Sequence, residues 1–311
     1  MTDVVPDAHS GCYLAIPIHS VGSESLRKYP EWCLGFDSFR SGGSDVPDIT
    51  IDPDEGVLSV INATNSPKTY YITVENCDRI IVNGGCDILS ENKSRSGRDY
   101  VTFVVLAYPD TRVDLCRLEP NSRRRKKRLS YSALASVRIS SDMQEYIERS
   151  PSGHWIALQV FPLVGSTFLC TQSSGGALTH FAHPSTYHAV DFRCPMGTPV
   201  VAIADSVVVD IRNDSSNSGV RVEDLFKWNS IILKTVEGEL FVEYVHVRKD
   251  SFRFAVGDSV KTGDIICMSG AAGFCPEPHL HFEIHASGEP GSDSLELRWK
   301  GSPFFAGQSY P

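Results

Sequence analysis

Alternation of apolar and polar positions runs along most of the chain, and it predicts β-strands more often than helices. In the N-terminal part, three strand-like runs rich in Val, Ile, Tyr and Phe are separated by turns of Asn, Gly and Asp. The runs cover 57–61, 69–74 and 100–106, and the turns cover 62–65 and 83–85. This spacing predicts a small antiparallel sandwich over residues 10–117. It contains no catalytic motif, so a binding or packing role is the expectation.

The C-terminal half continues the same pattern. Strand-like runs follow one another at 186–192, 200–211 and 240–247, and short runs joined by Gly-Asp turns occupy 256–266. Tight turns of this kind join antiparallel strands. We therefore expect a mainly β fold throughout, with a second antiparallel β domain over residues 151–311.

One strand in this half carries unusual chemistry. Residues 279–285 have the sequence His-Leu-His-Phe-Glu-Ile-His, which predicts a half-buried strand with apolar residues on one face and polar residues on the other. The polar face consists of His279, His281, Glu283 and His285. The first two histidines point the same way, about 7 Å apart along the backbone. Such rigid placement suits a metal site or an acid–base pair, although the outward face of any strand can carry histidines.

Two other strands supply candidate partners. Asp191 lies in the apolar run 186–192, where burial of an unpaired carboxylate is costly. Its side chain is therefore turned outward or bound to a cation. The run 240–247 places Val242, Tyr244 and His246 on one face.

Five blocks of sequence, in this order and spacing, resemble the lysostaphin-type (LytM-like) zinc endopeptidases. They are 188–202, 229–233, 243–246, 256–264 and 278–282, within a resemblance that covers roughly residues 165–290. The resemblance implies the family's antiparallel β fold, a duplicated hybrid motif. It also implies a zinc ion held by one His, Asp191 and His281, with His246 and His279 acting on water and the reacting peptide. Three protein ligands leave a fourth zinc position open, as in catalytic zinc sites.

The first zinc ligand departs from the family's usual pattern, which has His four residues before the Asp. That position is Tyr187, which we expect to pack, and His188 is only three residues before the Asp, so strand parity points it the other way. Some members of the family take this His from an upstream loop, after a Gly-rich Ser/Thr-His segment. Residues 175–180 resemble that segment, so His180 is the expected ligand and His183 is the alternative.

Several neighbouring residues have plainer interpretations. His285 lies about 13 Å along the strand from His281, and we expect it to be a solvated surface residue. Glu283 is either a partner for an imidazole or a solvent-facing carboxylate. Cys194 and Cys275 are expected to be small packing residues.

The chain of 311 residues is long enough for two domains, and its hydrophobic fraction of 41% is normal for a globular protein. No apolar run is long enough for a transmembrane helix, and the N-terminus lacks the features of a signal peptide. Nine cysteines without CxxC spacing indicate reduced thiols. We therefore expect a cytoplasmic or intracellular location, whereas the substrate that the resemblance implies lies outside the cytoplasm.

The net charge of −9 argues against general binding to nucleic acid or anionic membranes. The run 123–128, with six consecutive basic residues, is the exception. It is either a nuclear-localisation or anionic-partner patch or a solvated loop. It lies in an expected connector, 118–150, which also contains the one predicted helix, near 141–148, capped by Ser or Asp.

Together these features predict a zinc-dependent metalloendopeptidase. His180, Asp191 and His281 would hold Zn²⁺, and His246 and His279 would be the catalytic histidines. The resemblance implies a peptide cross-link of peptidoglycan, or another Gly-containing peptide, as the substrate. Two alternatives stay open: a LytM-like module that binds a peptide or partner without cleaving it, and zinc that only stabilises the fold.

Overall fold

A computed structural model describes most of the C-terminal half and the main strands of the N-terminal half. The described residues are 15–17, 48–51, 56–75, 79–82, 100–119, 138–146, 154–176, 179–289 and 291–311. The chain divides into two compact units, Met1–Ile147 with Arg221–Glu223, and Glu148–Val220 with Asp224–Pro311. The basic run 123–128 and the predicted turn 83–85 lie outside the described residues. The division of the chain into a domain at 10–117, a connector at 118–150 and a domain at 151–311 stays a prediction.

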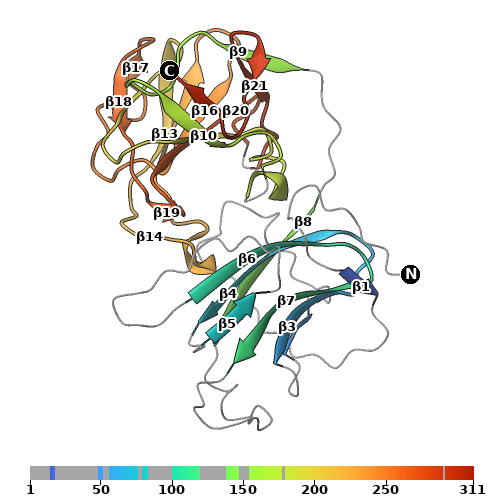
Figure 1. The fold of residues 1–311 in the computed structure, drawn as a ribbon. Coiled ribbons are helices and arrows are strands. Elements are labelled where there is room, and N and C mark those ends of the chain that lie inside the picture. Colours follow the sequence, from blue (N-terminus) through green and yellow to red (C-terminus); the bar gives the residue numbers. More distant parts are fainter. Residues whose placement is uncertain are drawn as a thin grey trace. The chain divides into compact units, whose positions relative to one another are not determined.

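The first unit contains two antiparallel sheets (Figure 1). The five-stranded sheet has the order β1-β7-β3-β2, with β5 also paired to β7, and the three-stranded sheet has β4 between β6 and β8. The strands of the first sheet are β1 (Ala15–Pro17), β2 (Asp48–Ile51), β3 (Val57–Asn62), β5 (Arg79–Val82) and β7 (Thr111–Glu119). Those of the second are β4 (Lys68–Glu75), β6 (Tyr100–Ala107) and β8 (Arg138–Glu145).

Side chains from both sheets of the first unit pack into one hydrophobic cluster. Leu58 and Leu115 come from the five-stranded sheet, and Ile72 and Phe103 come from the three-stranded sheet. All four are fully buried. Two sheets that share one core form a sandwich, so the sandwich-like fold predicted for this region is confirmed.

The predicted helix near 141–148 is wrong, because Arg138–Glu145 form strand β8. Local composition favours a helix here, since Met, Gln and Glu are good helix formers. Tertiary structure overrides that preference: β8 pairs with β4 over its whole length, antiparallel and without a bulge. Its Met143 side chain is fully buried in the shared core.

The second unit is built on an eight-stranded antiparallel sheet with the order β17-β13-β15-β16-β20-β11-β10-β23. In chain order its strands are β10 (Phe168–Gln172), β11 (Val190–Arg193), β13 (Ser206–Arg212), β15 (Ser230–Thr235), β16 (Phe241–Val245), β17 (Ser259–Val260), β20 (His279–His285) and β23 (Ser309–Tyr310). Most of the runs expected to be strands are strands here. The run 186–192 is shorter than predicted, since only its end belongs to β11.

Smaller sheets complete this unit. They pair β12 (Pro199–Val201) with β18 (Ile265–Met268), β14 (Ser218–Gly219) with β19 (Gly273–Phe274), and β21 (Glu296–Trp299) with both β9 (Trp155–Leu158) and β22 (Ser302–Pro303). Among the described residues, the short 3-10 turn η2 (His180–Ala182) belongs to this unit, and η3 (Val222–Asp224) includes residues assigned to each unit. Within the described residues, no helix has the length and apolar character needed to cross a membrane.

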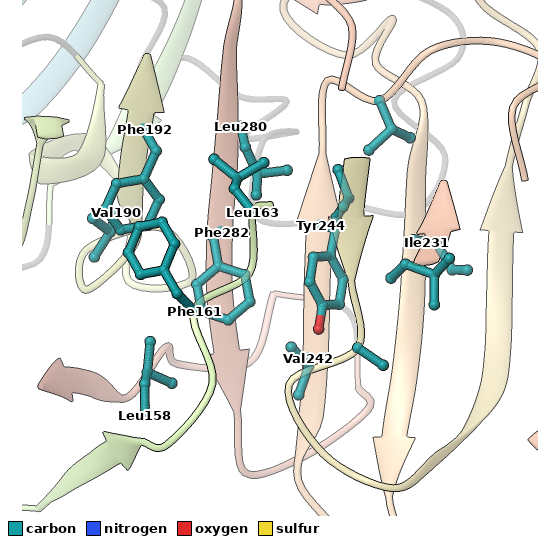
Figure 2. Packing of buried hydrophobic residues seen from close by; sticks show 14 of the residues in the cluster. Leu158, Phe161, Leu163, Val190, Phe192, Ile231, Val242, Tyr244, Leu280 and Phe282 are labelled. Carbon is teal, nitrogen blue, oxygen red and sulfur yellow. The ribbon is translucent and has the colours of Figure 1, made fainter. Parts of the chain in front are cut away.

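The apolar face of the large sheet forms the core of the second unit (Figure 2). Leu280 and Phe282 of β20 lie between Phe192 of β11 and Tyr244 of β16, and all four are fully buried. The hydroxyl of Tyr244 accepts a hydrogen bond from the backbone N–H of Ile203 at 3.2 Å. Burial of each large apolar side chain contributes about 1.5–3 kcal/mol, so this packing holds β20 and its neighbours rigidly.

Strand β20 buries both of its faces, not only the apolar one. It is an inner strand, paired with β16 on one side and β11 on the other. Its polar side chains are therefore withdrawn from water, and each needs a partner within the protein or a bound ion.

Candidate metal centre

Asp191 and His281 face each other across two paired strands. Asp191 lies on β11 and His281 on β20, and they are direct partners in the antiparallel register. Nδ1 of His281 lies 2.8 Å from Oδ1 of Asp191. Both residues are buried, so the sheet fixes their relative position, as a metal site requires.

His180 reaches the same point from a loop. It opens the turn η2, and its side chain is fully buried. Its Nε2 lies 3.1 Å from Oδ1 of Asp191 and 3.2 Å from Nδ1 of His281. Its Nδ1 lies 3.2 Å from the carbonyl oxygen of Ser173. A proton on Nδ1 satisfies that carbonyl and leaves Nε2 with a lone pair for a ligand.

These three residues offer the donor atoms of a metal site. Two imidazole nitrogens and one carboxylate oxygen lie within 4.8 Å of one another, and this set suits zinc. In the metal-free protein, burial raises the pKa of Asp191, but the charges of His180 and His279 lower it well below its usual range. Asp191 is therefore a carboxylate at neutral pH, as a cation ligand must be.

His246 lies beside this cluster and not on the core face with Val242 and Tyr244, so the face predicted from strand parity is wrong. Strand β16 ends one residue earlier, and His246 has a left-handed backbone with a φ of 60°, which turns its side chain away from the strand's alternation. Its Nδ1 lies 2.7 Å from the carbonyl oxygen of Ala272. The centroid of its ring lies 4.6 Å from that of His279.

His279 stands next to Asp191 on the polar face of β20. Its Nδ1 lies 2.7 Å from the carbonyl oxygen of Glu277, and its Nε2 lies 3.6 Å from Oδ2 of Asp191. The sulfur of Cys275 lies 3.3 Å from the same Nδ1. Cys275 therefore contacts a site histidine, whereas Cys194 packs in the core as expected.

The environments of the two histidines outside the metal cluster move their pKa values apart. In the metal-free protein, burial and the charges of His279 and His281 lower the pKa of His246 to about 3. Burial also acts to lower the pKa of His279, but the charge of Asp191 outweighs it and the pKa rises to about 9. A pair with one neutral and one protonated imidazole at pH 7 can accept one proton and donate another.

The other candidate ligands lie elsewhere. Nδ1 of His183 lies 2.8 Å from the hydroxyl of Ser185, and that of His188 lies 3.1 Å from the hydroxyl of Ser174. The ring of Tyr187 packs edge-on against His188. Neither His183 nor His188 belongs to a potential metal cluster among the described residues.

A second polar cluster lies behind His281 and consists of Glu243, Glu283 and His285, whose ligand atoms also lie within 4.8 Å of one another. His285 is buried, so the predicted solvated histidine is wrong. Nε2 of His285 lies 3.3 Å from one oxygen of Glu283, and Nε2 of His281 lies 3.4 Å from the other. Both carboxylate oxygens therefore face imidazoles, which favours a role in holding His281 over a second cation site.

Glu243 completes this cluster from β16, directly opposite Glu283 in the register. Burial, followed by the charge of Glu283, raises the pKa of Glu243 to about 7. The pKa of Glu283 moves the opposite way: burial acts to raise it, but the charge of His285 lowers it overall. Alternation along β16 places Glu243 opposite the core face, but sequence alone does not pair it with Glu283.

Comparison with known proteins shows that the sequence around this site matches a known protein family. Residues 185–292 match the model of peptidase family M23. The matched range includes Asp191, His246, His279 and His281, and His180 lies just before it.

Two curated relatives illustrate the match. Glycyl-glycine endopeptidase ALE-1 of Staphylococcus capitis is 37% identical over 97 residues, 31% of this chain and 24% of the relative. Peptidoglycan DD-endopeptidase ShyA of Vibrio cholerae is 31% identical over 114 residues, 35% of this chain and 23% of the relative. The chain thus spans about a quarter of the length of these relatives. A solved catalytic domain of lysostaphin from Staphylococcus simulans is 26% identical, with 42% of this chain and 87% of that chain covered and a TM-score of 0.31.

Proposed function

We propose that the second unit is a zinc-dependent endopeptidase, because residues 185–292 match the model of peptidase family M23 and the chain is similar to glycyl-glycine endopeptidase ALE-1. His180, Asp191 and His281 hold the zinc ion, and His246 and His279 are the catalytic histidines. The observation that supports this most is the convergence of these five side chains, from three strands or strand ends and one loop, on a single buried point.

The distances among the three ligand atoms fit a zinc ion. Neighbouring ligands of tetrahedral zinc, with bonds of about 2.0–2.1 Å, lie about 3.3 Å apart. The corresponding distances here are 2.8, 3.1 and 3.2 Å. Each ligand histidine also has its second ring nitrogen near an acceptor: a backbone carbonyl for His180 and a carboxylate for His281.

His246 is placed to take a proton from water. A bound zinc would supply a Lewis acid that polarises a peptide carbonyl and lowers the pKa of water. The Nδ1–H of His246 donates to Ala272, so Nε2 carries the lone pair. Since burial keeps this imidazole neutral at pH 7, Nε2 can accept the proton as general base.

His279 has the complementary role. Its Nδ1–H donates to the carbonyl of Glu277, which fixes the ring, and Nε2 points towards Asp191. With a proton on Nε2, His279 can donate a hydrogen bond to the developing oxyanion or a proton to the leaving amine.

The substrate we propose is a peptide cross-link of peptidoglycan or another Gly-containing peptide. The support is the activity named for two relatives, a glycyl-glycine endopeptidase and a peptidoglycan DD-endopeptidase. Each relative aligns with about a third of this chain.

Cleavage by the zinc-loaded full chain tests this function. The substrates are a pentaglycine peptide and purified peptidoglycan, and mass spectrometry identifies the products. We expect cleavage by the wild type and none by His246→Ala, although that variant keeps its zinc. His183→Ala is the matched control and should cleave normally. A wild type that binds zinc yet cleaves neither substrate would favour a binding module over an enzyme.

A further inference from the structure

An irregularity in the sheet lies next to the metal cluster. Along the β10–β11 pair, Cys170 stands opposite Phe192, but Gln172 stands opposite Asp191, so Thr171 is an extra residue on β10. Cys170 and Gln172 are two positions apart and would share a face in a regular strand. Their partners, Phe192 and Asp191, are adjacent and lie on opposite faces. The bulge therefore moves Gln172 from the core face to the face that bears Asp191.

The amide of Gln172 then contacts both sides of the site. Its Nε2 donates to Oδ2 of Asp191 at 2.7 Å and lies 3.2 Å from Oγ1 of Thr179. Its Oε1 accepts the backbone N–H of Thr179 at 3.0 Å. Gln172 is buried, with 6% of its surface exposed. A short, buried hydrogen bond to a carboxylate is among the stronger neutral–ionic contacts in proteins.

Thr179 directly precedes His180, so the second contact fixes the turn that carries this histidine. Thr179 is the N-terminal cap of η2 and makes no capping hydrogen bond with its own side chain. The Gln172 amide accepts the backbone N–H of Thr179, and the His180 side chain is held by the contact of its Nδ1 with the carbonyl of Ser173. Both anchors come from the end of β10 or the residue after it.

We propose that Gln172 is a positioning residue for the zinc site, which rests on the zinc peptidase function proposed above. One side chain orients Oδ2 of Asp191, leaving Oδ1 directed at His180 and His281. The same side chain holds the loop-borne His180 in reach of the two ligands that the sheet supplies. The Gln172 amide thus couples a strand ligand to a loop ligand.

Two substitutions separate the two contacts. Gln172→Glu keeps the shape and the acceptor for the Thr179 N–H but has no N–H for Asp191, and it sets two carboxylates against each other. Gln172→Ala removes both contacts. Gln308→Glu adds the same charge at an exposed glutamine of the same unit and is the matched control.

The zinc dissociation constant of each full-length variant is measured by competition with a chelator of known affinity, beside the melting temperature of the metal-free chain. We expect the constant to rise about 10–100-fold in both Gln172 variants, as is typical when an outer partner of a metal ligand is lost, and to stay unchanged in Gln308→Glu. The melting temperature of metal-free Gln172→Glu is expected to fall as well, because the variant loses a buried hydrogen bond and buries a second carboxylate beside Asp191. The zinc dissociation constants are therefore compared at a temperature at which every variant is fully folded.

Other results have distinct meanings. Wild-type affinity in both Gln172 variants would overturn the positioning role, and so would a loss in Gln172→Ala alone, because the contact with Asp191 would then carry nothing. A wild type that binds no zinc would instead overturn the proposed function.

Discussion

His281 Nδ1 lies 2.8 Å from Asp191 Oδ1, and the two residues are register partners on β20 and β11. In the metal-free protein this contact holds a proton between them. Burial alone lowers the pKa of His281, but the hydrogen bond and charge of Asp191 outweigh burial and raise the pKa to about 10. A metal ion at this point must displace the proton.

Zinc affinity should therefore increase with pH. Below the metal-free pKa of His281 the proton competes with zinc for Nδ1, so lower pH favours the protonated, metal-free state. We expect a change of about tenfold per pH unit for each proton displaced. Chelator competition at pH 6, 7 and 8 measures it, and calorimetry in two buffers of different ionisation enthalpy counts the protons released. An affinity that is flat over this range would rule out His281 as the ligand.

Glu283→Gln tests the carboxylate behind the metal cluster. The change keeps the size of the side chain but removes the charge that faces Nε2 of His281 and Nε2 of His285. We expect zinc to bind about 10-fold more weakly, since His281 loses the partner that orients it. The readout is the zinc dissociation constant. Glu239→Gln, at an exposed glutamate paired with Lys234, is the control. An equal loss of zinc affinity in this control would contradict the role of Glu283 as the partner of His281.

Gly270→Ala tests how the backbone places His246. A Cβ at Gly270 would lie 2.8 Å from the carbonyl oxygen of His246 and 2.8 Å from the backbone nitrogen of Arg248. These are backbone atoms, so the left-handed segment at His246 must shift. We expect a stability loss of about 1–3 kcal/mol and a lower kcat, with zinc content unchanged. Thermal unfolding measures the stability, peptide cleavage measures kcat, and elemental analysis measures the zinc content. Normal cleavage would show that this backbone conformation is not needed to place His246.

Strand periodicity predicts much of the second unit. The alternation of residues 279–285 places His279 and His281 on one face, as observed, because β20 is a regular strand with two regular neighbours. His188 is separated from Asp191, as predicted, but the reason is that it lies in a turn before β11 and not strand parity. The structure places His180 at Asp191 instead.

The errors arise where a strand stops being regular or where distant segments cover it. Parity fails at His246 because the strand has ended and φ has become positive. Parity does not predict that Gln172 faces Asp191, because the bulge moves Gln172 to the other face of the sheet. No local feature of the sequence marks Thr171 as the extra residue. His285 is buried, and its Nδ1 lies 3.0 Å from the carbonyl oxygen of Ser292, seven residues on. The alternation along the strand does not predict this contact.

Helix propensity misleads in the same way at β8. Its side chains favour a helix in isolation, but pairing with β4 supplies backbone hydrogen bonds and burial that no isolated helix at this position would have. Only the tertiary partner distinguishes the two outcomes.

The most direct test of the central claim is the zinc content of the purified full chain, measured by elemental analysis for wild type, His180→Ala and His183→Ala. His180 and His183 are both buried histidines three residues apart, so the two variants are closely matched. We predict about one zinc per chain in wild type and His183→Ala, and a large loss in His180→Ala. Full zinc content in His180→Ala, or none in reloaded wild type, would contradict the site.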